Sequence, residues 1–373
     1  MRIMNSKDVD AAVSLTTRAL RDVAHLDWDV PAAGLEWSCR DTVVHVAEDF
    51  TAYAAQLTVR AADAYVPLRI AADEGTGPAG LLDMIEASGG FLSAAVALAG
   101  PGARAWHPYG SAGADGFAAM GVVETLLHTH DILGGLGVHG WEPDPVLAEG
   151  VLDRLFPHVP RGHEAWRTLL WATGRGELPG LARQTTWRWY AEPVRTERLL
   201  LCPMSPAVAD DLQAGGTGGF AWVEDGPADD TRDAGGIVTR AREAGTYRAG
   251  WGPYVIVRTS DRKAIGGMGF HAAPDADGSS EVGYDLVPSA RGNGYATEAL
   301  KALSAWAFGR PGFTRLDATT DEDNVPSQAV LRRAGFTEAG TGEGLVRYVL
   351  RGSGAELRQV PAGPPARRAG SAW

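Results

Sequence analysis

The stretch from Glu281 to Leu300 constrains the fold of this chain more than any other. An apolar alternation ends at Pro288, and from Gly294 through Trp306 and Phe308 the apolar residues recur at helical spacing. The pattern predicts a strand, a glycine turn and a helix in direct succession. We expect this turn to be the chemical centre of the chain.

The turn, residues 291–296, precedes a helix whose first backbone N–H groups have no partner inside the helix. Those groups and the positive end of the helix dipole form an anion site suited to a phosphate or pyrophosphate. Gly292 and Gly294 would permit both the turn and the close approach of a ligand. A tight turn without a ligand needs similar glycines, so the turn alone leaves both interpretations open.

Three segments in order resemble the GNAT family of N-acetyltransferases. Arg291-Gly-Asn-Gly-Tyr-Ala296 resembles the acetyl-CoA pyrophosphate loop of that family, and the segment from Asn324 to Phe336 resembles its Asn-x-x-Ser, helix, Gly-Phe ending. The segment Arg195–Leu201 is similar to the first strand of the branch that acetylates ribosomal-protein N-termini. The resemblance covers residues 195–351. It implies an α/β acyltransferase domain with a mixed, mainly antiparallel sheet, in which acetyl-CoA is the co-substrate.

The resemblance also implies which residues bind and react. The residues expected to bind acetyl-CoA are Leu286, Val287, Arg291, Gly292, Asn293, Gly294, Tyr295, Ala296 and Asn324. The backbone N–H groups of residues 285–287 are expected to stabilise the oxyanion. The acceptor would be a primary amine, on a small molecule or a protein N-terminus.

Two residues are candidates for proton transfer in that reaction. Glu281 could deprotonate the amine through water, or it could be a solvated strand residue. The family often has a tyrosine acid on its last helix, but Leu331 occupies that position. We therefore expect Ser327 to protonate or orient the departing thiolate, unless it caps its helix.

The first half of the chain has the pattern of a helical bundle. Apolar periodicity, capping residues and glycine or proline stops predict helices over 8–26, 38–57, 81–99, 117–133, 145–156 and 164–172. Four of these are long. The expected fold is therefore an all-α four-helix bundle.

Glu124 and His128 stand four residues apart and share one face of the fourth helix, while His45 lies on the second helix among apolar residues. Two imidazoles and a carboxylate can bind a divalent metal and leave a coordination position open. A core histidine and a surface Glu–His pair would give the same spacing. His130, two residues further on, could be an alternative ligand, but a loop-facing residue is the simpler interpretation.

The segments Trp37–His45 and Glu124–Asp131 resemble the N-terminal domain of mycothiol-dependent maleylpyruvate isomerase, a DinB-like bundle. The segment Leu170–Trp189 is similar to actinobacterial members, so the match covers residues 8–190. The resemblance implies that His45, Glu124 and His128 bind a divalent metal, often zinc, which could activate mycothiol. It leaves two alternative functions open: a thiol-dependent transferase or isomerase with an accessory acetyltransferase domain, and a non-catalytic CoA-sensing protein.

Composition limits the partners and the compartment. The net charge is −12 and no basic stripe occurs, so nucleic acid and anionic membranes have no electrostatic support as partners. The chain has two cysteines, no apolar segment at its N-terminus and no apolar run long enough to span a bilayer, so we expect a cytoplasmic protein. The oligomeric state is not indicated.

The domains are expected at 1–193 for the metal-binding bundle and 194–351 for the acetyltransferase. Residues 214–236, rich in Gly, Asp and Ala, predict a long loop that either covers the acceptor or is a mobile insertion. Residues 352–373 lack periodicity and predict a disordered tail.

Overall fold

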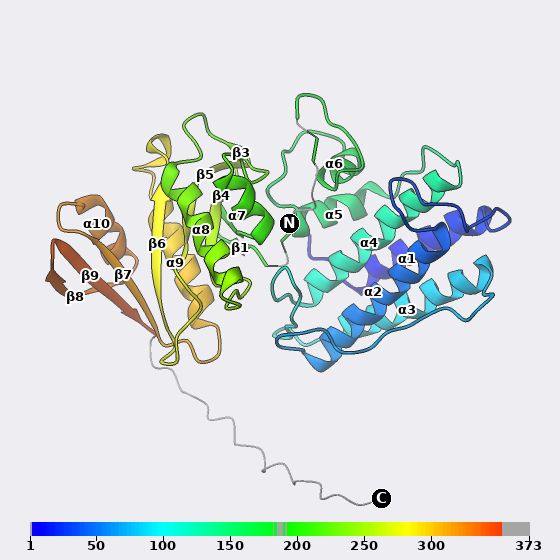
Figure 1. Ribbon diagram of the computed structural model, residues 1–373, viewed down its shortest axis with the longest axis horizontal. Helices are drawn as coiled ribbons and strands as arrows, with labels where there is room; N and C mark the ends of the chain where they lie inside the picture. The colour runs from blue at the N-terminus through cyan, green and yellow to red at the C-terminus, as the bar shows by residue number, and fades with distance from the viewer. Residues whose placement is uncertain (1, 182, 185–188, 191, 353–373) are drawn as a thin grey trace, which may run out of the picture.

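The computed structural model describes residues 2–181, 183–184, 189–190 and 192–352. Its two parts lie side by side along the longest axis, with helices α1–α6 in one and a sheet flanked by helices in the other (Figure 1). The tail predicted at 352–373 lies outside the described residues except for Gly352, as do Trp187 and Arg188 of the segment that resembles actinobacterial members.

Each helix predicted in the first half is present. Their bounds are α1 Ser6–Asp22, α2 Cys39–Val59, α3 Pro78–Leu98, α4 Ala114–Gly135, α5 Pro145–Leu155 and α6 Ala165–Ala172. Ser38 caps α2 as expected, because its hydroxyl accepts a hydrogen bond from the N–H of Asp41 at 3.0 Å. Helix α4 lies at the centre of the bundle and is buried along most of its length. The predicted all-α fold of this part is confirmed.

Small residues let the central helices approach closely. A Cβ atom added to Gly121 on α4 would lie 2.4 Å from Leu92 Cδ2 and 3.2 Å from the Phe50 ring, whereas one added to Gly90 on α3 would meet nothing within 4 Å. Extra atoms in a packed core force neighbours off their preferred rotamers. Close packing at Gly121 therefore depends on the missing side chain.

We expect Gly121→Leu to destabilise the bundle by about 3 kcal/mol, at the upper end of the overpacking range. Gly90→Ala should stabilise it by roughly 0.5–1 kcal/mol, because alanine restricts the unfolded chain in an open helical position. Urea unfolding followed by circular dichroism measures both. Equal midpoints for the two variants would contradict close packing at Gly121.

One helix among the described residues, α3, is long and apolar enough to span a membrane by length and composition alone. The expectation that no such run exists is wrong for this helix by that criterion. In the structure, 44% of its most apolar window is buried, and its inward residues Leu81, Ile85 and Leu92 belong to the bundle core. The apolar composition of α3 is thus used in part to pack against the neighbouring helices.

The second part is built on a sheet of nine strands within the described residues. The order is β1 Val194–Arg195, β2 Leu199–Pro203, β4 Pro253–Arg258, β5 Lys263–Phe270, β6 Ser279–Leu286, β7 Arg315–Asp321, β9 Leu345–Arg351 and β8 Thr337–Gly342, with β3 Ala221–Trp222 beside β5. Only the β6–β7 and β3–β5 pairs are parallel among these strands. The mixed, mainly antiparallel sheet is confirmed.

Helices cover both faces of this sheet (Figure 1). Leu199 and Leu201 of β2 face the core shared with α9 (Tyr295–Phe308), while Leu200 and Cys202 face the core shared with α7 (Pro206–Gln213) and α8 (Asp229–Glu243). This alternation follows from the two-residue period of a strand. Helix α10 (Val325–Arg333) packs on the α9 side through Leu331.

The prediction of one long loop over residues 214–236 is wrong, because β3 and the first half of α8 fall inside it. Two of the glycines in this stretch, Gly235 and Gly236, are buried on α8. A Cβ atom on Gly235 would lie 3.0 Å from the carbonyl oxygen of Ala209 on α7. These glycines therefore allow close helix packing instead of breaking the helix.

Direct contacts join the two parts. The carboxylate of Glu192 pairs with Arg104 of the bundle and, at 2.7 Å, with Arg310 after α9. Arg262 of the sheet domain donates a hydrogen bond to the carbonyl oxygen of Pro157 at 2.5 Å. The rings of His158 in the first part and Phe220 in the second contact each other and the ring of Tyr190. Ionic and apolar contacts thus fix the junction.

Candidate functional site

Strands β6 and β7 pair only at their start. The parallel register joins Ser279, Ser280 and Glu281 to residues 315–317, and no pairing follows, although β6 continues to Leu286. The N–H of His271 donates to the Glu281 carbonyl and that of Val287 to the Ile265 carbonyl, so odd-numbered residues of β6 bond to β5. Tyr284 and Leu286 therefore turn their backbone groups to the opened edge, where an extended ligand can lie.

This register changes the expected oxyanion contacts. The N–H of Val287 donates to Ile265 at 3.0 Å and is not free for a ligand. The N–H of Leu286 faces the opened edge. Of residues 285–287, Leu286 is the one whose N–H the register leaves available.

The glycine turn follows the end of β6. After a 3₁₀ turn, Pro288–Ala290, both Gly292 and Gly294 have a φ of +77°, a region that L-residues disfavour. A Cβ atom on Gly292 would meet nothing within 4 Å, so open space lies beside it. The strand, turn and helix predicted for 281–300 are present as predicted.

Polar side chains hold the turn in shape. Arg291 Nε donates to the Leu286 carbonyl at 2.9 Å, and Asn293 Nδ2 donates to the Ala290 carbonyl at 3.2 Å. Arg198 bonds the Asn293 carbonyl and the Glu298 carboxylate and lies over the ring of Tyr295 at 4.8 Å. Arg198 was not predicted, because its position just before β2 is remote in sequence from the turn.

The turn fits a phosphate group. The first N–H groups of α9 have no partner inside the helix. Thr297 Oγ1, in the first turn of α9, is buried and makes no hydrogen bond within the described residues. An oxyanion of pyrophosphate beside Gly292 would satisfy donors of this kind.

An acidic cavity of about 310 Å³ lies beside β6, and Tyr284 and Asp285 of this strand both line it. It is lined by Asp285, His271 and Gly283 together with Asp230 and Asp233 of α8. Burial raises the pKa of Asp285 to about 6, against a hydrogen bond of 2.7 Å from Thr231. A carboxylate with a pKa near neutrality is suited to take a proton from an ammonium group.

Glu281, which was predicted to deprotonate the amine, is not among the residues that line this cavity. Its carboxylate lies 3.6 Å from Nδ1 of His271, and this contact holds the pKa of Glu281 below its usual value. Glu281 therefore positions His271, which does line the cavity. The sequence points to Asp285 only through its backbone, and a loop over residues 214–236 would not have predicted its burial by the first half of α8.

Asn324 and Ser327 lie together at the start of α10. Asn324 is the cap of this helix, because its Oδ1 accepts the N–H of Ser327 at 3.1 Å. The Ser327 hydroxyl is instead 2.8 Å from the hydroxyl of Tyr284. Capping is therefore done by Asn324, and Ser327 is free to act with Tyr284, a residue that the sequence did not single out.

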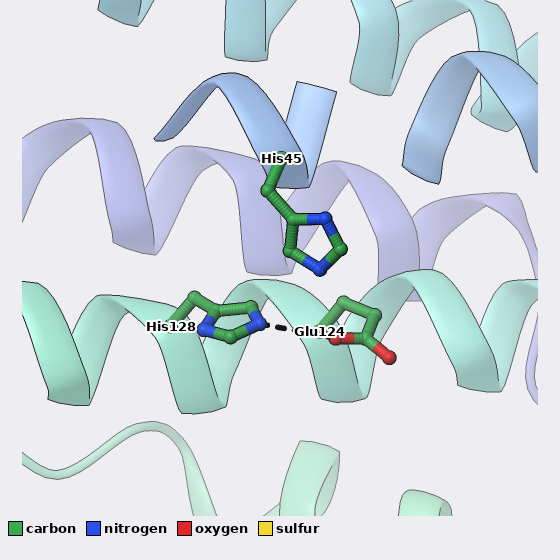
Figure 2. Close-up of side chains that lie close together, drawn as sticks. All are labelled: His45, Glu124 and His128. Carbon is green, nitrogen blue, oxygen red and sulfur yellow. Dashed lines mark ion pairs between the residues drawn. The ribbon is translucent and has the colours of Figure 1, made fainter. Parts of the chain in front are cut away.

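The three predicted metal ligands come together between α2 and α4. Ligand atoms of His45, Glu124 and His128 all lie within 4.8 Å of one another. Figure 2 shows the His45 ring extending from α2 toward the gap between Glu124 and His128, which are joined by an ion pair of 3.3 Å. Two nitrogens and one oxygen converging from three side chains suit a divalent cation such as zinc and leave positions open.

A second set of side chains orients these ligands. Asp131 Oδ2 lies 3.1 Å from His128 Nδ1 and is itself bound by Arg175 at 2.7 Å. This directs Nε2 of His128 toward Glu124. Although burial opposes a charge on the ring, hydrogen bonds with Asp131 and Glu124 raise the pKa of His128 to about 9, so bound metal would replace a proton.

Asp49 extends the cluster. Its carboxylate lies 3.4 Å from His45 Nε2, and burial together with the charge of Glu124 raises its pKa. The spacing of four residues from His45 was a signal that the sequence contained. His130 instead packs against the ring of Trp166 at 5.8 Å and is not part of the cluster.

Two family models match the chain. The model of the acetyltransferase (GNAT) domain matches residues 198–337, and that of the mycothiol maleylpyruvate isomerase N-terminal domain matches residues 9–133. Both resemblances expected from the sequence are thereby confirmed.

Curated relatives match a smaller part of the chain than either family model does. The uncharacterized N-acetyltransferase YjdG of Bacillus subtilis (strain 168) is 36% identical over 87 residues, which is 23% of this chain and 52% of that protein. The uncharacterized N-acetyltransferase YoaA of the same strain is 31% identical over 104 residues, 28% of this chain and 55% of that protein. The chain thus spans about half the length of the curated relatives it matches.

Solved structures also resemble the sheet domain. An acetyltransferase from Agrobacterium tumefaciens str. C58 is 24% identical, with 46% of this chain and 100% of that chain covered and a TM-score of 0.32. The ribosomal L7/L12 alpha-N-protein acetyltransferase RimL, in complex with coenzyme A, is 19% identical, with 43% and 98% covered and a TM-score of 0.31. The chain therefore contains a mycothiol maleylpyruvate isomerase N-terminal domain at residues 9–133 and an acetyltransferase (GNAT) domain at residues 198–337.

Proposed function

We propose that this protein is an N-acetyltransferase that moves the acetyl group of acetyl-CoA to a primary amine. The observation that carries the proposal is that β6 leads into the open glycine turn and also presents Asp285 to an acidic cavity. The turn suits the pyrophosphate and the cavity suits a cationic amine. The acceptor is the amine of a small molecule or of a protein N-terminus.

Different residues of the chain bind acetyl-CoA, deprotonate the amine and protonate the thiolate. The N–H groups of the turn and Thr297 Oγ1 hold the pyrophosphate, assisted by Asn324, and Leu286 N–H faces the thioester oxygen. Asp285 takes a proton from the ammonium, and the freed amine attacks the carbonyl carbon. As the C–N bond forms and the C–S bond breaks, the Ser327 and Tyr284 hydroxyl pair supplies a proton to the thiolate. The nitrogen releases its second proton as the amide forms, and this proton restores the hydroxyl pair through solvent.

Strand geometry supports this division. Side chains of successive β6 residues point to opposite faces, so Tyr284 and Asp285 lie on opposite sides of the strand. The acid and the base are thereby separated by the strand along whose edge the thioester would lie. Glu281 contributes by holding His271 at the cavity.

The reaction is tested by incubating the full chain with acetyl-CoA and a panel of amines, including a diamine and a peptide with a free N-terminus. We expect release of free CoA that depends on the amine, detected with a thiol reagent. Binding of CoA without release for any amine would instead favour the CoA-sensing alternative. Preference for the peptide or the diamine identifies the acceptor class.

We expect Asp285→Asn to lower kcat/KM by roughly 10²–10⁴-fold, the usual contribution of a general base. In the parent protein Asp285 is protonated below about pH 6 and cannot accept the proton, so kcat/KM should fall about tenfold per unit below that pH. The variant should lack this acidic limb. Glu281→Gln should keep the limb and lose activity more mildly, and a limb retained in Asp285→Asn would assign the base elsewhere.

For the bundle we propose a divalent metal site formed by His45, Glu124 and His128, in a domain that covers residues 1–193, with the acetyltransferase at 194–351. A bound divalent cation would act as a Lewis acid that lowers the pKa of a thiol or water. Asp131 and Arg175 fix the orientation of His128, and Trp37 covers the His45 ring at 4.7 Å. Activation of a low-molecular-weight thiol such as mycothiol is the second candidate function, favoured by the converged cluster.

We propose that the protein acts in a reducing cytoplasm. Cys39 and Cys202 are both free and buried. Burial raises the pKa of Cys39 to about 11 and that of Cys202 to about 12, so neither is a reactive thiolate. A thiol nucleophile would have to come from outside the chain.

A further inference from the structure

A cavity of about 510 Å³ lies at the junction of the two domains and belongs to neither site described above. The bundle contributes residues of the loops after α2 and α3, including Ala62, Trp106 and Tyr109. The acetyltransferase domain contributes the loop before β4 and the residues at the end of α9. The volume falls in the range of small-molecule sites, which often lie between domains. We call it the junction cavity.

Aromatic rings form its walls. Trp106 and Tyr109 line it from the bundle, and Trp251 and Trp306 line it from the other domain. The rings of Trp251 and Trp306 are 5.0 Å apart at 65°, and the Arg310 guanidinium lies over Trp306 at 4.2 Å. Rings presented from two sides suit a flat, apolar body that is itself aromatic.

Donors without partners indicate the polar part of the ligand. Trp306 Nε1 and Arg310 Nε are buried and form no hydrogen bond with any part of the chain that the structure describes. Both residues line the junction cavity. Buried N–H groups are rarely left unpaired in native proteins, and both of these can only donate. Turned toward the cavity, these side chains would donate to a ligand that supplies acceptor oxygens.

The charges favour an anion. Arg248 lines the cavity, is exposed, and has no side-chain partner among the described residues. The Glu192 carboxylate is already held by Arg104 and Arg310. Asp63, the remaining acid of the lining, is exposed to solvent on the bundle side. An oxyanion near Arg248 and Arg310 would gain charge-assisted hydrogen bonds.

From these features we infer that the junction cavity binds a small ligand with a planar aromatic body and a carboxylate, held by residues of both domains. The cavity is distinct from the acetyl-CoA turn, because Arg310 follows the C-terminal end of α9 and Gly294 precedes its N-terminal end. The 14 residues of α9 separate these ends by about 20 Å.

The test is calorimetric titration of the full chain with naphthalene-2-carboxylate. We expect saturable binding at one site, and binding of the uncharged 2-naphthylmethanol that is at least about tenfold weaker, since hydrogen bonds to charged groups contribute most here. Arg248→Gln should weaken carboxylate binding about tenfold or more. Arg333→Gln, an exposed arginine on α10 outside the cavity, is the matched control and should change nothing.

A second variant fills the space from the bundle side. Ala62→Trp places a large ring at an exposed position of the lining, so it should reduce binding without disturbing either core. Saturating CoA should leave the affinity unchanged. The inference is overturned by absence of saturable binding, by equal affinity for the alcohol, by insensitivity to both variants, or by displacement of the carboxylate by CoA.

Discussion

Replacing Gly292 by valine should lower the affinity for coenzyme A by about 100-fold or more. The φ of +77° disfavours any side chain, and a branched one would also fill the open space where the pyrophosphate must approach the N–H groups. Loss of a few charge-assisted hydrogen bonds at about 1.5–3 kcal/mol each accounts for this magnitude. Calorimetric titration with coenzyme A measures it.

Gly312 provides the matched control for that substitution. Its φ is +78°, and a Cβ atom there would also meet nothing within 4 Å, but it lies in the turn before β7. Gly312→Val therefore introduces the same backbone strain away from the proposed ligand. We expect both variants to lose similar stability and only Gly292→Val to lose coenzyme A affinity. Equal affinities in the two variants would remove the basis for the enzymatic proposal.

The second large effect concerns the metal cluster. His128→Ala removes one of three converging ligands together with the group that Asp131 orients, so zinc affinity should fall by at least about 100-fold. His45→Ala should have a similar effect. Metal content after purification and titration of the chelated protein with zinc measure both. Retention of stoichiometric zinc by either variant would mean that the cluster is a hydrogen-bonded core group.

Graded controls separate coordination from folding. Asp131→Asn should weaken zinc binding by roughly 10–100-fold, because it alters the group that orients His128 without removing a ligand. His139→Ala, at an exposed position after α4, should leave metal content and unfolding unchanged. Acetyl transfer measured on the zinc-free protein then tells whether the bundle affects the second domain.

Much of the fold follows from local sequence patterns. The periodicity of the first half predicts six helices near their observed positions, and Ser38 identifies the start of α2. The alternation before Pro288 and the glycines after it predict the turn at the end of β6. These features depend on residues close in sequence, whose conformations are governed by backbone sterics and capping.

The wrong predictions concern segments whose conformation depends on tertiary contacts. Gly235 and Gly236 indicate a loop when considered locally, yet they allow α8 to lie against α7. That error hid Asp285, whose raised pKa results from burial near α8. Likewise the family's tyrosine would fall on α10, at Leu331, whereas the hydroxyl beside Ser327 belongs to Tyr284 of β6. Pairings across the sheet carry no signal in a single sequence.

The metal cluster could be predicted from the sequence only in part. The spacing of Glu124 and His128 places both on one face of α4, but only the packing of α2 against α4 brings His45 to them. Asp49 was available from the same spacing rule, one turn after His45. Arg175 lies 44 residues from Asp131, the aspartate that it binds, so no spacing rule identifies it.

Glu192 gives the junction an unusual dependence on one side chain. It stands between Arg104 and Arg310, and burial, followed by the nearby charge of Arg310, lowers the pKa of Arg104 against the opposing effect of Glu192. Without this carboxylate the same two guanidinium groups would repel each other. The electrostatic attraction between the domains at this point would become a repulsion. The junction would then depend on the hydrogen bond from Arg262 to Pro157 and on the packed rings of His158, Tyr190 and Phe220.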